Sequence, residues 1–333
     1  MAKSYNPTQY MYSSARIRAL EVKIATRERL RQLSDATNAE SVIAGLADLG
    51  FETAKNGVAL SREEMLESLL VNAYAEMEAM ECADAVKFMR YQYDANNIKA
   101  IIKCHSRGVS ADSLLSRFGT VSEADAKKAF ENKDYSAFPK NIAEAIAEAE
   151  EAFAATTDPQ KIDFIIDRAC FADMLESVDA LGMDFAKRLV RTKIDIVNIT
   201  VTLRVMRMEL GNMALGILKE AYIAGGSFAL DFFENALSVG EEAFASDIEA
   251  RGYSSIADAI AKNETLGTIE RRADDAWFSV AKEAKYISFG AEIAVGYIAA
   301  LEYQVKNIRI ILAGKDASIA PELIRERLRD CYA

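Results

Sequence analysis

The sequence holds only one histidine, four cysteines and four prolines among its 333 residues. One histidine cannot supply the two Glu-x-x-His motifs of a dimetal helical bundle, and the scattered cysteines form no Cys-x-x-Cys pair for a zinc site. Sparse proline beside abundant alanine, glutamate, lysine and leucine favours helices over a turn-rich β fold. We therefore expect an all-α protein that uses no metal or other cofactor.

The usual catalytic motifs are absent as well. There is no Gly-x-Ser-x-Gly nucleophile elbow, and Gly314-Lys315 lacks the upstream glycine and the downstream hydroxyl of a phosphate-binding loop. Asp274-Asp275 is not followed by the third aspartate of diphosphate-metal enzymes, so a solvated helix face is its expected role. His105 is expected at the surface or at the C-terminal end of a helix. These absences favour a non-catalytic protein.

Long apolar runs are also missing. The longest, residues 293–301, is far short of the roughly 20 residues that cross a bilayer, and residues 1–12 have no apolar core like that of a signal peptide. The net charge of −11 argues against nucleic-acid binding by the chain as a whole. We expect reduced core thiols in a cytosolic protein. The four cysteines are Cys82, Cys104, Cys170 and Cys331.

Against these absences stands a motif that occurs three times, at residues 93–102, 194–203 and 303–312. Each copy reads Asp or Gln, two residues, Asn-Ile, and then aliphatic and polar residues. A buried amide can hydrogen-bond across a helix contact, and every repeat needs a packing solution, whereas a catalytic site is seldom needed three times. We interpret the motif as structural, with a ligand-binding role for its asparagine as the alternative. Its polar positions are Asp94 and Asn97, Asp195 and Asn198, and Gln304 and Asn307.

The repeat extends beyond the motif. Each copy ends a long helical stretch, at about 62–104, 160–209 and 268–313, and Gly119 after the first copy matches Gly226 after the second. Residues 46–51 resemble an incomplete second half of such a unit, which the third unit lacks. Stacked helical units form a curved surface or enclose a cavity. We therefore predict one compact chain of three similar units, approximately 1–110, 111–215 and 216–333.

The first 31 residues are basic, with seven lysine or arginine side chains against two glutamates, a net charge of +5 in a chain of −11. This bias predicts either an ordinary solvated helix face or a surface that meets an acidic partner or membrane headgroups. Arg16, Arg18 and Glu21 are the candidate assembly contacts in this segment. A buried Arg-Glu pair would explain the same residues equally well.

Both ends of the chain resemble a known family. Residues 10–21 read Tyr-Met-Tyr-Ser-Ser-Ala-Arg-Ile-Arg-Ala-Leu-Glu, and residues 302–315 read Glu-Tyr-Gln-Val-Lys-Asn-Ile-Arg-Ile-Ile-Leu-Ala-Gly-Lys. Together with the two Asp-x-x-Asn-Ile segments, these are similar to the family of C subunits of V/A-type ATP synthases, equivalent to the d subunit of the vacuolar ATPase. The sequence departs from the pattern at Gln304, where the first two copies have aspartate.

This resemblance implies an all-α, non-catalytic rotor subunit whose three pseudo-repeated helical units form a funnel with a central cavity. The funnel would sit peripherally on the cytoplasmic face of the membrane, as a socket between the central-shaft subunits D and F and the proteolipid (c/K/L-type) ring. Torque for ion transport coupled to ATP synthesis or hydrolysis would pass through it. Arg309, in the C-terminal pattern, joins Arg16, Arg18 and Glu21 as a candidate assembly contact.

The residues alone leave two other classes open. A cytosolic helical-repeat scaffold or adaptor would have the same composition and repeat, but an open, elongated shape instead of a funnel. An all-α enzyme with an unrecognised carboxylate site would depend on Asp94 and Asp195.

Overall fold

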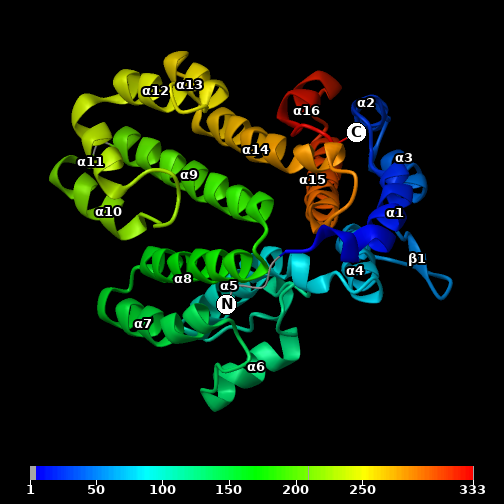
Figure 1. The fold of residues 1–333 in the computed structure, drawn as a ribbon, viewed down its shortest axis with the longest axis horizontal. Helices are drawn as coiled ribbons and strands as arrows, with labels where there is room; N and C mark the ends of the chain where they lie inside the picture. Colours follow the sequence, from blue (N-terminus) through cyan, green and yellow to red (C-terminus); the bar gives the residue numbers. More distant parts are fainter. Residues whose placement is uncertain (1–4, 209, 333) are drawn as a thin grey trace. The chain divides into compact units, whose positions relative to one another are not determined.

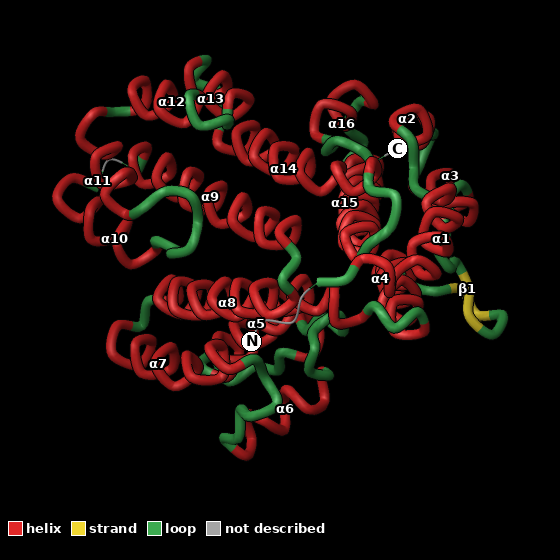
Figure 2. Tube along the Cα trace, in the orientation of Figure 1, coloured by secondary structure: helices red, strands yellow, loops and turns green. Residues whose placement is uncertain are grey.

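The computed structural model of the protein describes residues 5–208 and 210–332. The described chain is mostly helical (Figure 1), so the all-α expectation is confirmed. Its strands form one antiparallel hairpin, β1 (Ala54–Lys55) with β2 (Val58–Ala59), coloured yellow in Figure 2. This hairpin was not expected from the sequence, although Asn56 and Gly57 both have positive φ, as an Asn-Gly turn requires.

The chain packs as two compact units. Unit 1 comprises Met1–Tyr5 and Lys87–Asn263, and unit 2 comprises Asn6–Val86 and Glu264–Ala333. Helix α5 begins in the last residues of unit 2 and continues into unit 1. The division into three similar units near 1–110, 111–215 and 216–333 stays a prediction.

Unit 2 is organised around one central helix, α15 (Ala291–Asp316), against which most of its other helices pack. Because α15 is surrounded, its 26 residues are buried on nearly all sides and not along a single stripe. Gly296 permits this packing, since a Cβ there would lie 2.4 Å from the Cβ of Ala284. The other helical elements of unit 2 are η1 (Pro7–Tyr10), α1 (Met11–Leu20), η2 (Glu21–Lys23), α2 (Arg27–Asp35), α3 (Ala39–Ala44), η3 (Ala47–Leu49), α4 (Arg62–Ala79), α14 (Leu266–Lys282), η6 (Glu283–Tyr286) and α16 (Pro321–Arg327).

Unit 1 packs its helices mainly as neighbours in sequence. Helix α8 contacts α7, α9 and α10, and α9 contacts α10 and α11 (Figure 1). An ion pair of 2.7 Å between Lys99 and Asp167 joins α5 to α8. The elements of unit 1 are α5 (Ala83–His105), η4 (Asp112–Leu114), α6 (Glu123–Asn132), α7 (Lys140–Thr156), α8 (Pro159–Leu181), α9 (Asp184–Arg207), η5 (Gly211–Met213), α10 (Ala214–Ala221), α11 (Leu230–Val239), α12 (Glu241–Glu249) and α13 (Ser254–Ala261).

The three long helical stretches expected from the sequence are each two helices. The first breaks between α4 and α5 at Glu81 (φ 55°), the second between α8 and α9 at Gly182 (φ 65°), and the third between α14 and α15 before Gly290 (φ 145°). These left-handed φ values cannot belong to a continuing right-handed helix. Expecting continuous stretches was therefore wrong, while the motif does lie in the second helix of each pair. Residue 209, the expected end of the second stretch, lies outside the described residues.

Candidate functional site

In each motif copy, the asparagine side chain hydrogen-bonds to both the backbone N–H and the backbone C=O of one residue further along the chain. The side-chain N–H donates to the carbonyl oxygen and the side-chain oxygen accepts the backbone N–H, at N···O distances from 2.7 to 3.2 Å. We call these contacts the amide clamps. The three pairs are Asn97 with Ser116, Asn198 with Ile223, and Asn307 with Arg329.

Each amide clamp fixes a non-helical segment to the side of its motif helix. The clamped segments lie after α5, before α11 and after α16, where regular structure supplies no partner for the backbone. An unpaired buried N–H or C=O costs about 1–3 kcal/mol, so the asparagine amide stabilises each segment by pairing both groups.

The aspartates of the first two copies accept hydrogen bonds only. Asp94 accepts from the N–H (3.0 Å) and hydroxyl (2.6 Å) of Thr120 and from the N–H of Val121 (3.1 Å). Asp195 accepts from the N–H of Ser227 (2.6 Å) and the hydroxyl of Tyr253 (2.9 Å). Burial raises the pKa of both carboxyl groups, although the donated hydrogen bonds act in the lowering direction.

Glycine stands directly against each of these carboxylates. A Cβ at Gly119 would lie 2.3 Å from Oδ1 of Asp94, and a Cβ at Gly226 would lie 2.3 Å from Oδ1 of Asp195. The two glycines that the sequence aligned thus occupy the same position relative to their motif aspartates. In both places only glycine lets the backbone approach the carboxylate closely enough.

We expect Gly226→Ala to lower the free energy of unfolding by about 1–3 kcal/mol, because the new methyl group would overpack the Asp195 carboxylate. Gly216→Ala in α10 is the matched control, since no atom lies within 4 Å of its added Cβ. In a helix interior that change should stabilise the protein by about 0.5–1 kcal/mol. Urea unfolding of both variants measures the difference, and equal stabilities would contradict the close contact with Asp195.

Gln304 stands where the first two motif copies have aspartate, and its side-chain amide both accepts and donates a hydrogen bond. Its side-chain oxygen accepts the N–H of Ala25 (2.6 Å), and its side-chain N–H donates to the carbonyl of Leu49 (3.1 Å). A carboxylate cannot donate, so glutamine and not aspartate satisfies this position. The third motif helix is therefore joined to the N-terminal segment of unit 2, including the 46–51 stretch that the sequence singled out.

Comparison with known proteins decides the family. The family model described as "ATP synthase (C/AC39) subunit" matches residues 13–327. The chain belongs to this family. Its members are structural, non-catalytic subunits of rotary V/A-type ATPases, so the expected family and the expected lack of catalysis are both confirmed.

Curated relatives of the C/AC39 family agree with this assignment. The C subunit of the V-type sodium ATPase of Enterococcus hirae is 25% identical over 246 residues, 73% of this chain and 74% of its own length. The C subunit of the A-type ATP synthase of Thermococcus gammatolerans is 24% identical over 350 residues, 96% of this chain and 89% of its own length. That of Methanocaldococcus jannaschii is 24% identical over 353 residues, 96% and 86% respectively.

The charged assembly candidates all have partners inside this C/AC39 chain. Arg16 pairs with Glu76 (2.7 Å) and Arg309 pairs with Glu63, both at exposed positions. Arg18 pairs with Glu21 (2.8 Å), and it also donates to the carbonyls of Ala284, Lys285 and Ile287 at the end of η6. The half-buried Arg18–Glu21 pair agrees with the alternative of an Arg-Glu pair inside the protein. A role of Arg16, Arg18, Glu21 and Arg309 in assembly stays a prediction.

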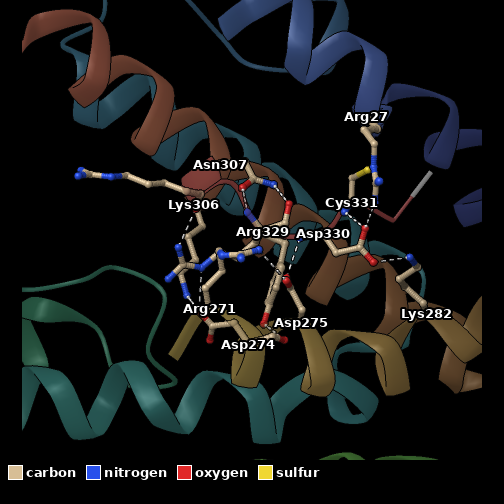
Figure 3. Close-up of polar contacts among 12 residues, drawn as sticks. Arg27, Arg271, Asp274, Asp275, Lys282, Lys306, Asn307, Arg329, Asp330 and Cys331 are labelled. Carbon is tan, nitrogen blue, oxygen red and sulfur yellow. Dashed lines mark hydrogen bonds and ion pairs between the residues drawn. The ribbon is translucent and has the colours of Figure 1, made fainter. Parts of the chain in front are cut away.

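Asp274 and Asp275 do not form the solvated helix face that the sequence suggested. Asp274 is 17% exposed and pairs with Lys306 and with Arg329 (3.0 Å), and Asp275 accepts the N–H of Asp330 (2.8 Å) (Figure 3). Burial raises the pKa of Asp275. The expectation was wrong because the segment that covers α14 comes from residues 329–330, far away in the sequence.

Little else in the described part of the chain offers chemistry. No three His, Cys, Asp or Glu side chains within it are placed to hold a metal, and no helix within it is long and apolar enough to cross a bilayer. The four cysteines are buried and form no disulfide in the described residues, and His105 is the exposed last residue of α5. A groove of about 770 Å³ between α14, α15 and α16 has a nearly balanced charged lining of three arginines and two glutamates.

Two further side chains, which the sequence did not point to, also bind backbone or motif groups by hydrogen bonds. Asp173 in α8 accepts the N–H groups of Asn141 (3.0 Å) and Ile142 (2.8 Å), so it caps α7 from a neighbouring helix. Tyr253 donates to Asp195, and burial together with this bond holds the pKa of the phenol well above its usual value. Asp173 is the charged residue of an otherwise apolar stretch of α8, residues 169–175, which was the available signal for it, whereas nothing in the sequence around Tyr253 distinguishes that residue.

Proposed function

We propose that the chain is the central-stalk rotor subunit of its ATPase, a socket that links the rotary shaft to the membrane proteolipid ring and transmits torque between them. The observation that carries the proposal is the triple occurrence of the amide clamp in a chain of the C/AC39 family. A part that transmits torque must resist deformation. The clamps tie non-helical segments to motif helices at places where a loop would otherwise yield.

The same proposal includes the arrangement and the partners. Three similar helical units would surround a central cavity as a funnel, with the shaft subunits D and F on one side and the proteolipid ring on the other. The subunit would lie peripherally on the cytoplasmic face of the membrane. The repeated contacts of Asn97, Asn198 and Asn307 support units of similar construction.

Reconstitution from purified parts tests the proposal. The chain should bind a D–F shaft subcomplex and a detergent-solubilised proteolipid ring at the same time, and it should bridge the two in size-exclusion chromatography. A chain that bound only one of them, or neither, would contradict a linking role and would favour a helical scaffold instead.

Arg309 offers a test of assembly that is separable from folding. Its partner Glu63 is 61% exposed and Arg309 itself 53%, so loss of this pair should change stability by no more than about 1 kcal/mol. We expect Arg309→Glu to stay folded by circular dichroism and to weaken binding of the reconstituted partners at physiological salt. Glu63→Gln, which breaks the same ion pair from the other side, is the control. Unchanged binding by Arg309→Glu would remove this residue from the interface.

A further inference from the structure

Residues 328–332 of unit 2, which we call the strap, belong to no helix or strand; residues 328–330 are half-buried and residues 331–332 are buried. Cys331 is 8% exposed and Tyr332 is 3% exposed. Side chains hold the strap's backbone. Asn307 pairs with both backbone groups of Arg329, Asp275 accepts the N–H of Asp330, and Lys285 donates to the carbonyl of Tyr332 (2.8 Å). A segment held in this way can open without the unfolding of a helix.

The strap is joined to the N-terminal segment of unit 2 at two points. The Asp330 carboxylate binds Arg27 at the start of α2 (3.0 Å) and Lys282 at the end of α14 (2.7 Å), as Figure 3 shows. One carboxylate thus connects helices from opposite ends of the sequence. Burial acts to raise the pKa of Asp330, but the hydrogen bonds and charge of Lys282 and the bond from Arg27 leave it lowered.

Tyr332 makes the second connection. Its hydroxyl donates to Glu21 in η2 (3.2 Å), and Glu21 is the partner of Arg18, which binds the carbonyls at the end of η6. The ring lies beside Phe278 and under the ammonium group of Lys285 (5.5 Å). Withdrawal of Tyr332 would therefore remove a contact from Glu21 and, through it, loosen the position of Arg18.

The N-terminal segment and the strap are also both bound to α15, by the side chains of Gln304 and Asn307 on one face of that helix. Gln304 holds the N-terminal segment through Ala25 and Leu49, and Asn307, three residues later, holds the strap. Residues three apart are neighbours on a helix surface. The strap and the N-terminal segment are thus fastened side by side on the same helix.

We propose that the strap is a releasable fastener, which holds residues 7–49 more firmly on α15 while it is docked and loosens them when it opens, with α1, α2 and α3 still in contact with α15. Unit 1 stays folded in the open state. Because Arg16, Arg18 and Glu21 lie in the fastened segment, the strap would set whether these residues are presented in their folded arrangement. That consequence for assembly rests on the proposed function, whereas the release itself does not.

Hydrogen exchange of the full chain, followed by mass spectrometry, tests the release. We expect Asp330→Asn, which removes both ion pairs, to speed exchange in peptides of α1, α2 and α3 by about fivefold. Tyr332→Phe, which removes the hydroxyl and its bond to Glu21 but keeps the ring, should act in the same direction. The control is Asp316→Asn, because Asp316 forms an exposed ion pair with Arg62 that also joins the two ends of unit 2 but lies outside the strap.

The exchange rates in α1–α3 and in α8 and α9 distinguish the possible outcomes. Faster exchange in α1–α3 with unchanged exchange in α8 and α9 supports the fastener. Equal acceleration in α8 and α9 would mean that the strap only adds global stability, and unchanged exchange in α1–α3 in both variants would mean that the strap does not hold this segment. Either result overturns the proposal. If release occurs but binding to shaft and ring is unchanged, the fastener stands and the assembly role of Arg16, Arg18 and Glu21 fails.

Discussion

Gln304→Glu is expected to lower the free energy of unfolding by about 3–5 kcal/mol at neutral pH. Glutamate has the length of glutamine and keeps an acceptor for the N–H of Ala25. Its second oxygen, however, would face the carbonyl of Leu49, where the amide now donates at 3.1 Å. The side chain is only 3% exposed, so water cannot screen the new charge. Urea unfolding at pH 7 measures the effect.

The control for this change is its mirror image at the first motif copy. Asp94→Asn places an amide where three donors point at a carboxylate, so one donor loses its acceptor and about 1–3 kcal/mol is lost. The charge change is opposite in the two variants, but both should destabilise, because hydrogen-bond polarity decides the residue at each site. A Gln304→Glu variant within about 0.5 kcal/mol of the unmodified protein would refute this explanation of the motif's departure.

Asn198→Ala is the second large effect, an expected loss of about 2–4 kcal/mol. Alanine leaves both the N–H and the carbonyl of Ile223 without the partners that now lie 2.9 and 2.8 Å away. Ile223 is 3% exposed, so water does not readily replace the lost amide. The midpoint of thermal or urea unfolding should move accordingly.

Asn97→Ala is the matched comparison, because the first clamp has the same geometry around a less buried partner. Ser116 is half-buried, and water can reach its backbone groups once the amide is gone. We expect a smaller loss, about 1–2 kcal/mol. If the two substitutions cost the same, burial of the clamped residue does not set the strength of a clamp.

The repeated motif could be found from sequence because its spacing and residue types recur along the chain. Asn97, Asn198 and Asn307 stood out in helical surroundings, and Gly119 matched Gly226 in the turns that follow the first two copies, although at a different spacing from the asparagine. Their partners could not be found, because Ser116, Ile223 and Arg329 lie 19, 25 and 22 residues away with no shared sequence pattern. A single amide accepts any residue's backbone, so the partner carries no signature.

For the charged residues, too, the sequence shows which residues are present but not which partners they bind. The basic bias of residues 1–31 is visible in the sequence, but whether it forms a free surface depends on acids brought from elsewhere. Glu76 and Asp330 supply partners to Arg16 and Arg27 from 60 and 303 residues away. Likewise, the sequence predicts that Asp274 and Asp275 are solvated, whereas in the structure residues 329–330 of the strap bind them.

By itself, the sequence determined the all-α class and the recurring motif helices, because helix formation and apolar periodicity depend on neighbours a few residues apart. The family followed from the resemblance carried by residues 10–21 and 302–315 and from the family match. Only the tertiary structure decided why the third copy has glutamine, which groups the arginines bind and how residues 328–332 fasten both ends of unit 2. Those outcomes depend on hydrogen-bond donors and charges that meet across long sequence separations. Their energies come from burial, which no local stretch of sequence specifies.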